Sequence, residues 1–224
     1  MEAQDPVEGE SFMKHFIVLN AGPRKGWNTD LLLTKAAEGI RSEGADAEII
    51  DLYRLDKFTG CVSCFGCKTA AHLGHCVCRD GLKPVLEKID AADGLVIGSP
   101  NYLGEVTSVC RALFERLIFQ RLTYKKEPRS YAERSIPTLF VLTHNAPDGA
   151  YDELTKRYAG MLSAFVGPAK TLTAGATLQV NDYGRYGWDM FDPEERKARR
   201  ETVFPGIERQ AFELGAAMAR GDWA

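Results

Sequence analysis

Short apolar runs and longer amphipathic runs alternate along this 224-residue chain. The apolar runs predict strands at residues 14–19, 47–52, 94–98, 137–143 and 169–174. The amphipathic runs predict helices at residues 28–43, 85–89, 106–121, 151–166 and 206–220. Alternation of this kind requires a parallel sheet with helices on both faces. The predicted fold class is therefore α/β and doubly wound, with five parallel strands in the order 2-1-3-4-5.

The sequence also predicts how the chain is divided. Residues 1–12 are acidic and polar and are expected to form a flexible tail, whereas residues 13–224 are expected to form one domain of flavodoxin-like topology. Within that domain we expect a cysteine-rich loop at residues 56–81 and a C-terminal extension at residues 176–200. Gly44 lies just beyond the first predicted helix and suits the left-handed position that ends a helix.

Composition and charge argue against several classes of function. The formal net charge is −3 and no dense Lys/Arg stripe occurs, which disfavours nucleic-acid binding. The basic run at residues 196–200 follows two glutamates and is interpreted as a solvated helical face. No apolar run approaches the ~20 residues of a membrane span, and the acidic N-terminus does not resemble a signal peptide. We therefore expect a cytoplasmic protein that does not contact the membrane and whose cysteines stay reduced.

The loop at residues 20–29 follows the first predicted strand and leads into the first predicted helix. Backbone N–H groups and the positive end of a helix dipole meet at such a junction, which makes it an anion site. Arg24, Asn28 and Thr29 add donors suited to a phosphate monoester. The loop therefore predicts a site for a phosphorylated cofactor. Its candidate binding residues are Gly22, Arg24, Lys25, Trp27, Asn28 and Thr29.

Two further loops lie at the same edge of the predicted sheet, where folds of this kind bind ligands. In the loop at residues 99–107, Pro100 and Gly104 bracket a predicted turn, and Tyr102 offers a flat ring to a planar ligand. The loop at residues 143–147 supplies polar groups on the other side. The candidates in the two loops are Pro100, Asn101, Tyr102, Leu103, Gly104, Thr143, His144 and Asn145. No constellation of acid, base and nucleophile is convincing, so no catalytic residue is assigned.

A C-x2-C-x2-C run is followed closely by two more cysteines. Two intervening residues let such thiolates reach one metal centre. The candidate ligands are Cys61, Cys64, Cys67 and Cys76, with Cys78 as a second candidate for the fourth position. Three alternatives remain open: an iron–sulfur cluster, a zinc ion shared with His72 or His75, and thiols without metal. Cys110, which lies on a predicted helix, is expected to be a buried small apolar residue.

Together these motifs resemble the flavodoxin-like, NAD(P)H-dependent FMN reductase family, and especially its iron–sulfur flavoprotein branch. The resemblance covers nearly the whole chain from residue 14 onward, and residues 177–183 are similar to the C-terminal extension of some members. It implies that Arg24, Asn28 and Thr29 hold the phosphate of FMN. It implies that the flavin ring is lined by Pro100, Asn101, Tyr102 and Gly104. In the branch, a compact cysteine run binds a 4Fe–4S cluster, and members pair into homodimers or homotetramers.

Three features depart from the family pattern. Gly22 stands where a serine is common, so one hydroxyl donor to the phosphate is missing. Trp27 stands where a small or polar residue is more usual, and it either covers the phosphate or packs on the domain. The segment between Cys67 and Cys76 is longer than the compact spacing of the branch.

The resemblance implies an FMN-dependent oxidoreductase that passes electrons from NAD(P)H through FMN to a small acceptor such as a flavin or a quinone. In such proteins the cofactor carries the chemistry, and the chain binds and orients it. One alternative is an iron–sulfur flavoprotein electron carrier, with FMN and a 4Fe–4S cluster, that is reduced by a ferredoxin-like partner. A second alternative is a redox sensor that binds flavin or metal with negligible turnover.

Overall fold

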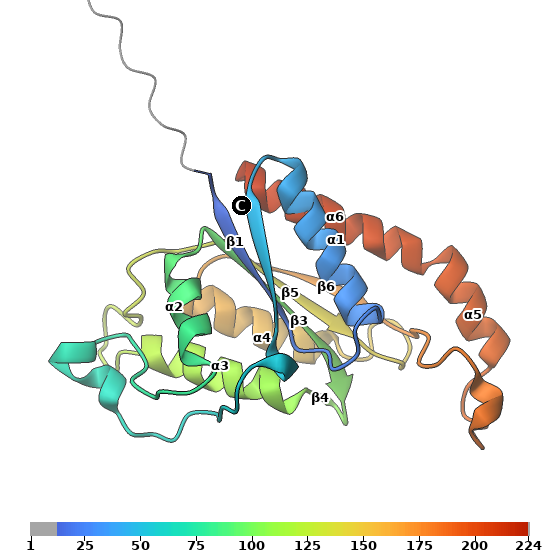
Figure 1. Ribbon diagram of the computed structural model, residues 1–224, viewed down its shortest axis with the longest axis horizontal. Helices are drawn as coiled ribbons and strands as arrows, with labels where there is room; N and C mark the ends of the chain where they lie inside the picture. Colours follow the sequence, from blue (N-terminus) through green and yellow to red (C-terminus); the bar gives the residue numbers. More distant parts are fainter. Residues whose placement is uncertain (1–12, 224) are drawn as a thin grey trace, which may run out of the picture.

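The computed structural model describes residues 13–223, and the predicted tail at residues 1–12 lies outside the described residues. Figure 1 shows a central sheet with helices on both faces. Its parallel strands are β1 (His15–Asn20), β2 (Asp46–Asp51), β3 (Gly94–Tyr102), β5 (Thr138–Thr143) and β6 (Ala169–Ala174). They lie in the order β2-β1-β3-β5-β6, and β4 (Glu105–Val106) is a short antiparallel addition to β3. The predicted doubly wound order is therefore confirmed.

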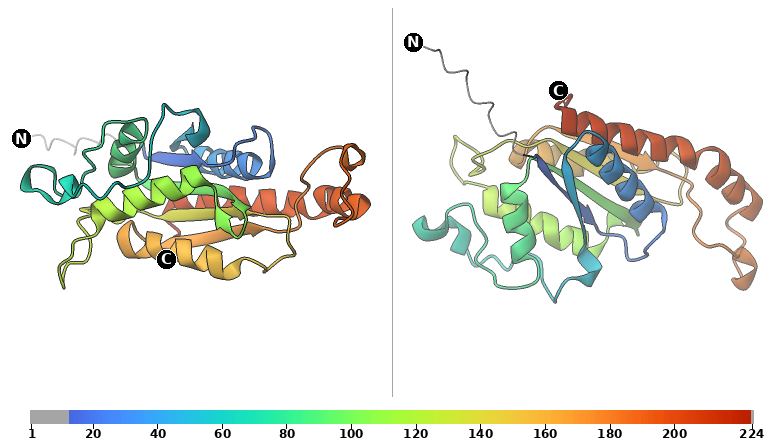
Figure 2. Two further views of the ribbon diagram at one scale, coloured as in Figure 1. Left: turned by 90° about the horizontal axis from the view of Figure 1, so that it is seen from below. Right: turned by 45° about the horizontal axis from the view of Figure 1, so that its top comes forward.

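The helices are α1 (Asn28–Ser42), α2 (Lys83–Ala91), α3 (Ser108–Arg121), α4 (Asp152–Phe165), α5 (Pro193–Thr202) and α6 (Phe204–Arg220). All but α5 form two layers on the sheet (Figure 2), and α5 packs on α6. Side chains of α1 and α6 share one buried cluster with the sheet, and those of α2, α3 and α4 share the other. Short 3-10 turns are η1 (Leu52–Arg54), η2 (Gly66–Lys68), η3 (Ala70–His72) and η4 (Tyr183–Arg185).

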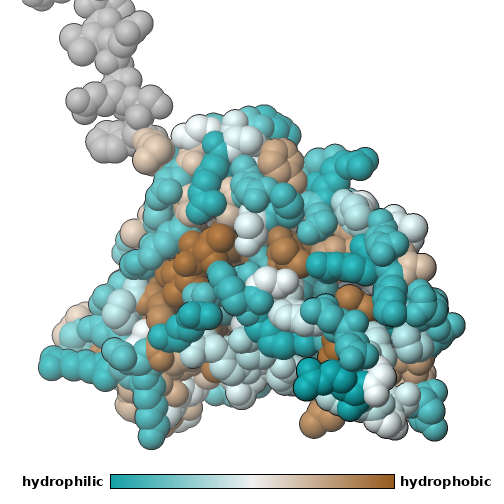
Figure 3. Space-filling view, turned by 45° about the vertical axis from the view of Figure 1, so that its right-hand side comes forward, coloured by the Kyte–Doolittle hydropathy of each residue, from teal (hydrophilic) through white to brown (hydrophobic). Residues whose placement is uncertain are grey.

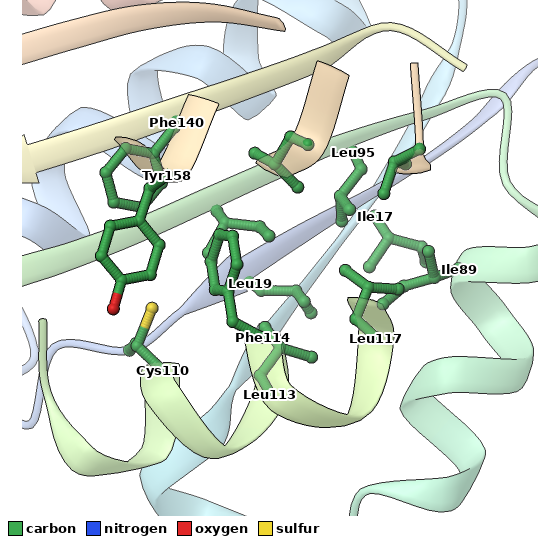
Figure 4. Close-up of a cluster of buried hydrophobic side chains, with 14 of the residues drawn as sticks. Ile17, Leu19, Ile89, Leu95, Cys110, Leu113, Phe114, Leu117, Phe140 and Tyr158 are labelled. Carbon is green, nitrogen blue, oxygen red and sulfur yellow. The ribbon is translucent and has the colours of Figure 1, made fainter. Parts of the chain in front are cut away.

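An aromatic group anchors the layer formed by α2, α3 and α4 (Figure 4). The Tyr158 ring meets the Phe114 ring edge to face at 4.6 Å and stacks on the Phe140 ring at 5.3 Å. Such pairs add about 0.5–1.5 kcal/mol beyond the area that they bury. Cys110 lies in the same cluster, where burial raises the pKa of its thiol to about 12. The expectation that Cys110 is a small buried apolar residue is confirmed.

The other layer depends on a close approach of α1 to α6, which lie side by side in Figure 1. A Cβ atom on Gly39 would lie 2.0 Å from the Phe212 carbonyl oxygen, and one on Gly215 would lie 2.0 Å from the Ala36 carbonyl oxygen. Only glycine fits at either position. Gly44 has a φ of +75° directly after α1, as predicted.

Three sequence predictions need correction. Val106 belongs to strand β4 and not to a helix, because the Thr107 side chain accepts a hydrogen bond from the Cys110 N–H and caps α3. Strand β3 continues to Tyr102, well beyond the predicted end. The basic run in α5 is not fully solvated, since Arg196 is buried against the Phe191 ring.

No helix among residues 13–223 is both long enough and apolar enough to cross a membrane.

Replacing Gly215 by alanine is expected to lower the free energy of unfolding by about 1–3 kcal/mol, because the new Cβ overlaps α1. The matched control is Gly206→Ala in the same helix, where nothing lies within 4 Å of the new atom. For this control the free energy of unfolding is expected to rise by about 0.4–1 kcal/mol. Chemical denaturation measures both effects, and equal unfolding midpoints for the two variants would contradict this helix packing.

Candidate functional site

Three loops meet in one pocket at the carboxyl ends of β1, β3 and β5, where doubly wound sheets bind ligands. The pocket is lined by Gly22, Pro23, Arg24, Trp27, Asn28, Thr29, Pro100, Tyr102 and Thr143. Apart from Pro23, these residues were all predicted to bind the cofactor. Other predicted residues (Lys25, Asn101, Leu103, Gly104, His144 and Asn145) do not line the pocket.

The first turn of α1 supplies backbone donors to this pocket. Trp27 is the N-cap residue of α1, and no side chain caps the helix there. The N–H groups of a first helical turn have no acceptor within the helix. Because Asn28 and Thr29 begin the helix and also line the pocket, this end of α1 suits an anion.

Asp30 fixes the shape of the loop before α1. Its buried carboxylate accepts hydrogen bonds from the Gly26 N–H at 2.7 Å and from the Lys25 ammonium at 3.0 Å. The Asn20 amide donates to the same carboxylate at 3.1 Å. The hydrogen bond to Asp30 raises the pKa of Lys25. Lys25 therefore belongs to the scaffold of the loop and does not line the pocket.

Hydroxyl groups join the three loops to one another. The Thr29 and Thr143 hydroxyls lie 2.7 Å apart and link α1 to the end of β5. The buried Thr107 hydroxyl donates to the Ala21 carbonyl at 2.9 Å, and the Thr107 N–H donates to the Ser99 hydroxyl at 3.0 Å. These bonds fix the loop after β1 against β3 and the start of α3.

The region after β3 is a hairpin and not the loop that was predicted. Asn101 pairs with Val106 across β3 and β4. The two turn residues, Leu103 and Gly104, have φ values of +55° and +81°, as in a primed two-residue turn. The Tyr102 side chain is 48% exposed beside the pocket, and Leu103 is fully exposed at the tip. The hairpin thus presents an aromatic ring and an apolar tip next to the phosphate-type donors.

Glu105 ties the hairpin to α4. Its carboxylate accepts hydrogen bonds from the Tyr158 hydroxyl at 2.7 Å and from Arg157 at 2.5 Å. Burial opposes the charge on Glu105, yet these hydrogen bonds and one from the Val106 N–H hold its pKa below the ordinary value. The ionised carboxylate therefore stabilises the hairpin.

His144 has a structural place behind the pocket. Its Nδ1 lies 3.0 Å from the Ala146 carbonyl, and its ring meets Tyr151 edge to face at 5.0 Å. Burial lowers the pKa of the His144 imidazole, which favours the neutral form. The His144 carbonyl accepts hydrogen bonds from Thr177, so this residue holds the start of the C-terminal extension. Asn145 is exposed.

The extension packs on its own domain and reaches back to the loop before α1, through contacts that the sequence did not predict residue by residue. Arg24 donates to the Gln179 carbonyl at 2.6 Å, and the Asn28 amide donates to the Leu178 carbonyl at 2.8 Å. Arg200 donates to the Asn28 side-chain oxygen at 2.9 Å. The Arg24 guanidinium also stacks on the Trp27 ring at 4.1 Å, so Trp27 packs against a pocket residue.

A second pocket gathers five cysteines. It is lined by Cys61, Cys64, Cys67, Cys76 and Cys78, together with Gly60, Val62, Phe65, Val77, Arg116, Phe119 and Gln120. The last three of these belong to α3, whose N-cap residue Thr107 is bonded to the loop after β1. The cysteines lie on the loop at residues 56–81, which is drawn at the left of Figure 1.

The backbone of this loop is bent tightly around the cysteine pocket. Ser63 and Phe65, which lie between the first three cysteines, have φ values of +52° and +57°. A residue other than glycine adopts a positive φ at a cost in free energy, and such residues are often found at functional sites. The Lys68 ammonium is fixed beneath the loop, where it donates to the carbonyls of Phe119, Gln120 and Leu122 at the end of α3.

The surroundings of Cys76 and Cys78 differ in charge. The Arg116 guanidinium donates to the Cys76 sulfur at 3.1 Å. The Cys78 thiol instead lies 3.9 Å from the Asp80 carboxylate. A thiolate is the form that binds metal, so the Arg116 N–H on its sulfur favours Cys76 as a ligand, whereas burial raises the pKa of the Cys78 thiol and Arg116 only partly offsets this.

Five thiols in one pocket are a donor set that suits an iron–sulfur cluster. Within residues 13–223, no group of three or more Cys, His, Asp or Glu side chains converges on one metal ion. The cysteines of a 4Fe–4S cluster bind separate irons, so their sulfurs need not converge. The Gln120 amide nitrogen supports this fit, because it is buried at the pocket without a hydrogen-bond partner among the described residues.

Comparison with known proteins agrees with this arrangement. The family model described as NADPH-dependent FMN reductase matches residues 14–178, which include all residues that line the first pocket and the five cysteines of the second. The chain belongs to the NADPH-dependent FMN reductase family. This membership supports FMN as the cofactor.

The relatives point to one branch of the family. An iron–sulfur flavoprotein of Archaeoglobus fulgidus is 35% identical over 119 residues, which are 52% of this chain and 55% of that protein. An iron–sulfur flavoprotein of Methanocaldococcus jannaschii is 35% identical over 100 residues, which are 45% of this chain and 50% of that protein. The chain thus spans about half the length of the curated relatives it matches.

Solved structures confirm the fold of this FMN reductase family member. An azoreductase from Bacillus anthracis superposes with a TM-score of 0.65 and covers 91% of this chain and 99% of its own. Its sequence identity is 14%, so the likeness concerns the fold alone.

Stability in acid is expected to depend on Glu105. A carboxyl whose pKa is lowered by folding stabilises the native state above its ordinary pKa of about 4.3, and this contribution is lost as the pH falls through the lowered value. The variant Glu105→Gln should therefore lose less unfolding free energy than the wild type between pH 7 and pH 3. Denaturation at several pH values measures this difference, and parallel pH profiles would show that Glu105 is not the group responsible.

Proposed function

We propose that this protein is an FMN-dependent oxidoreductase that takes electrons from NAD(P)H and passes them through bound FMN to a small acceptor such as a flavin or a quinone. The observation that carries this proposal is the meeting of three loops, an uncapped helix start and Arg24 in one pocket. FMN supplies the hydride and electron chemistry when it is bound. The chain supplies binding, orientation and access.

The phosphate of FMN is assigned to the start of α1. The enclosed part of the pocket measures about 40 Å³, and a water needs ~10–15 Å³ of such space, so the pocket has room for a phosphate group. Arg24 uses one nitrogen to contact Gln179, and a guanidinium carries five N–H groups, so others remain for phosphate. Thr29 and the first-turn N–H groups of α1 complete the donor set.

The flavin ring is assigned to the hairpin of β3 and β4, outside the enclosed part of the pocket. Pro100 and Tyr102 lead from the phosphate end of the pocket to the exposed tip. Asn101 has a buried side-chain nitrogen without a hydrogen-bond partner among residues 13–223, which provides a donor near this ring position. An open ring site of this kind gives a nicotinamide and a small acceptor access to the same face in turn.

The double variant Arg24→Ala, Thr29→Ala is expected to weaken FMN binding at least about tenfold, because hydrogen bonds to a charged phosphate contribute about 1.5–3 kcal/mol each. NADPH-driven reduction of a quinone should fall at low FMN and recover when FMN is added in excess. Flavin fluorescence titration measures the affinity.

The matched control for that variant is Lys35→Ala, which removes a half-buried cation from the same helix, where it pairs with Glu38. It should leave FMN affinity unchanged. Unchanged affinity in the double variant as well would show that the phosphate lies elsewhere.

A second candidate function is an iron–sulfur flavoprotein electron carrier with FMN and a 4Fe–4S cluster, reduced by a ferredoxin-like partner. The observation that favours it is the single pocket lined by five cysteines, and the relatives' names agree with it. The cluster supplies single-electron transfer when it is bound. Cys61, Cys64, Cys67 and Cys76 are proposed as its ligands.

Self-association is proposed as well, as a homodimer or a homotetramer. The loop before α5 exposes apolar side chains: Met190 is 82% exposed, and the stacked rings of Tyr186 and Trp188 are 43% and 46% exposed. Exposed apolar side chains gathered in one loop commonly mark contacts between proteins. The face drawn in Figure 3 is mainly hydrophilic and also carries patches of apolar surface.

Replacing Cys76 by serine is expected to remove most of the bound iron after anaerobic reconstitution, because a thiolate ligand is lost. The matched control is Cys78→Ser, two residues away, which should keep the iron content of the wild type. Analysis of iron and acid-labile sulfide measures the cluster content of the two variants. Loss of iron in Cys78→Ser but not in Cys76→Ser would reverse the assignment of the fourth ligand.

A further inference from the structure

Arg116 is a buried cation at the floor of the cysteine pocket. It extends from α3, and its side chain is only 1% exposed. Its Nε donates to the Cys76 sulfur at 3.1 Å. Its other nitrogens donate to the Thr59 carbonyl at 3.2 Å and to the Cys78 carbonyl at 3.3 Å. The guanidinium therefore touches the cysteine loop on both sides of the pocket and contacts one sulfur directly.

Asp80 holds this cation in place. Its carboxylate pairs with the Arg116 guanidinium at 2.7 Å and also accepts the Leu82 N–H at 3.1 Å. A buried charge needs such a partner, since an unpaired one is strongly destabilising. The charges of Arg116 and Asp80 nearly cancel each other. Arg116 therefore acts on the pocket mainly through the hydrogen bond from its Nε to the Cys76 sulfur, and only weakly through its positive charge.

Gln120 lies one turn beyond Arg116 on the same helix. Its side-chain oxygen accepts the Cys76 N–H at 3.1 Å, which fixes the backbone at this cysteine. Its buried amide nitrogen has no hydrogen-bond partner within residues 13–223, and Gln120 lines the same pocket. Two N–H donors of α3, from Arg116 and Gln120, are thus available to an electron-rich group bound by the cysteines.

We propose that Arg116 is a positioning residue that selects Cys76 as the fourth cluster ligand and raises the reduction potential of the cluster through its hydrogen bond to the Cys76 sulfur. The proposal rests on the second candidate function. Reduction adds one negative charge to the cluster, so an N–H donor on a ligand sulfur and a nearby cation stabilise the reduced form more than the oxidised form. Hydrogen bonds to sulfur are among the terms that set the potentials of such clusters.

The test is a redox titration of the anaerobically reconstituted holoprotein, with the cluster followed by electron paramagnetic resonance. The variant Arg116→Met, Asp80→Asn removes both charges of the buried pair and should make reduction at least tenfold less favourable, a shift of about 59 mV to more negative potential. The FMN midpoint serves as the internal control, because the FMN pocket lies at the other end of α3, and it should not change.

Two single variants are expected to shift the reduction potential of the cluster in opposite directions. Asp80→Asn keeps the Arg116 donor and removes a negative charge, so it should shift the cluster to more positive potential. Arg116→Lys keeps the charge but loses the Nε donor, so it should shift the cluster to more negative potential and by less than the double variant. A purely structural role for Arg116 predicts no such opposed pair. If the variants that break the buried pair lose their iron, Arg116→Lys decides the question, because it keeps a cation beside Asp80.

The possible failures are distinguishable. A wild-type protein without iron and sulfide after reconstitution would overturn the cluster assignment and the role of Arg116 with it, but not FMN binding. A wild-type cluster whose potential is unchanged in Arg116→Lys and Asp80→Asn would overturn the role of Arg116 alone.

Discussion

The buried hydroxyl of Thr107 is the contact on which both pockets depend. It bonds to the Ala21 carbonyl in the loop after β1, it caps the first turn of α3, and its backbone N–H bonds to Ser99 at the end of β3. The loops of the cofactor pocket and the start of α3 are therefore one rigid junction. From there α3 runs beneath the cysteine loop, and Arg116 lies about 14 Å along the helix from Thr107.

This arrangement connects two kinds of binding chemistry through one helix. At its start, the neighbouring loops and the uncapped end of α1 suit a phosphate, and the hairpin of β3 and β4 suits a flat ring. At its far end, Arg116 and Gln120 face five cysteines. The chain thus positions the proposed flavin site and the cysteine pocket at a spacing that is fixed by the packed helix α3.

The strand order and the edge of the sheet that carries the first pocket could be predicted. The apolar period of each segment is a local signal, and parallel strands joined by a helix are connected with a right-handed crossover. The place of Arg116 could not, because an arginine in a helix usually faces water and its burial depends on Asp80 and Cys76, some 40 positions away. One signal was present: Arg116 and Gln120 are spaced i, i+4 next to the apolar stripe of α3. The contacts of Arg24 with Gln179 and of Asn28 with Arg200 span more than 150 positions, which no local pattern encodes.

The most direct test of the account is the cofactor content of the protein purified without oxygen, from its visible spectrum together with flavin, iron and acid-labile sulfide analysis. The account predicts one FMN and about four irons with matching sulfide per chain, and a broad absorbance beneath the flavin peaks that is typical of a cysteine-ligated cluster. A protein that contains flavin but no iron or sulfide would contradict the assignment of a 4Fe–4S cluster to the cysteine pocket. A colourless protein that does not take up FMN would contradict it entirely.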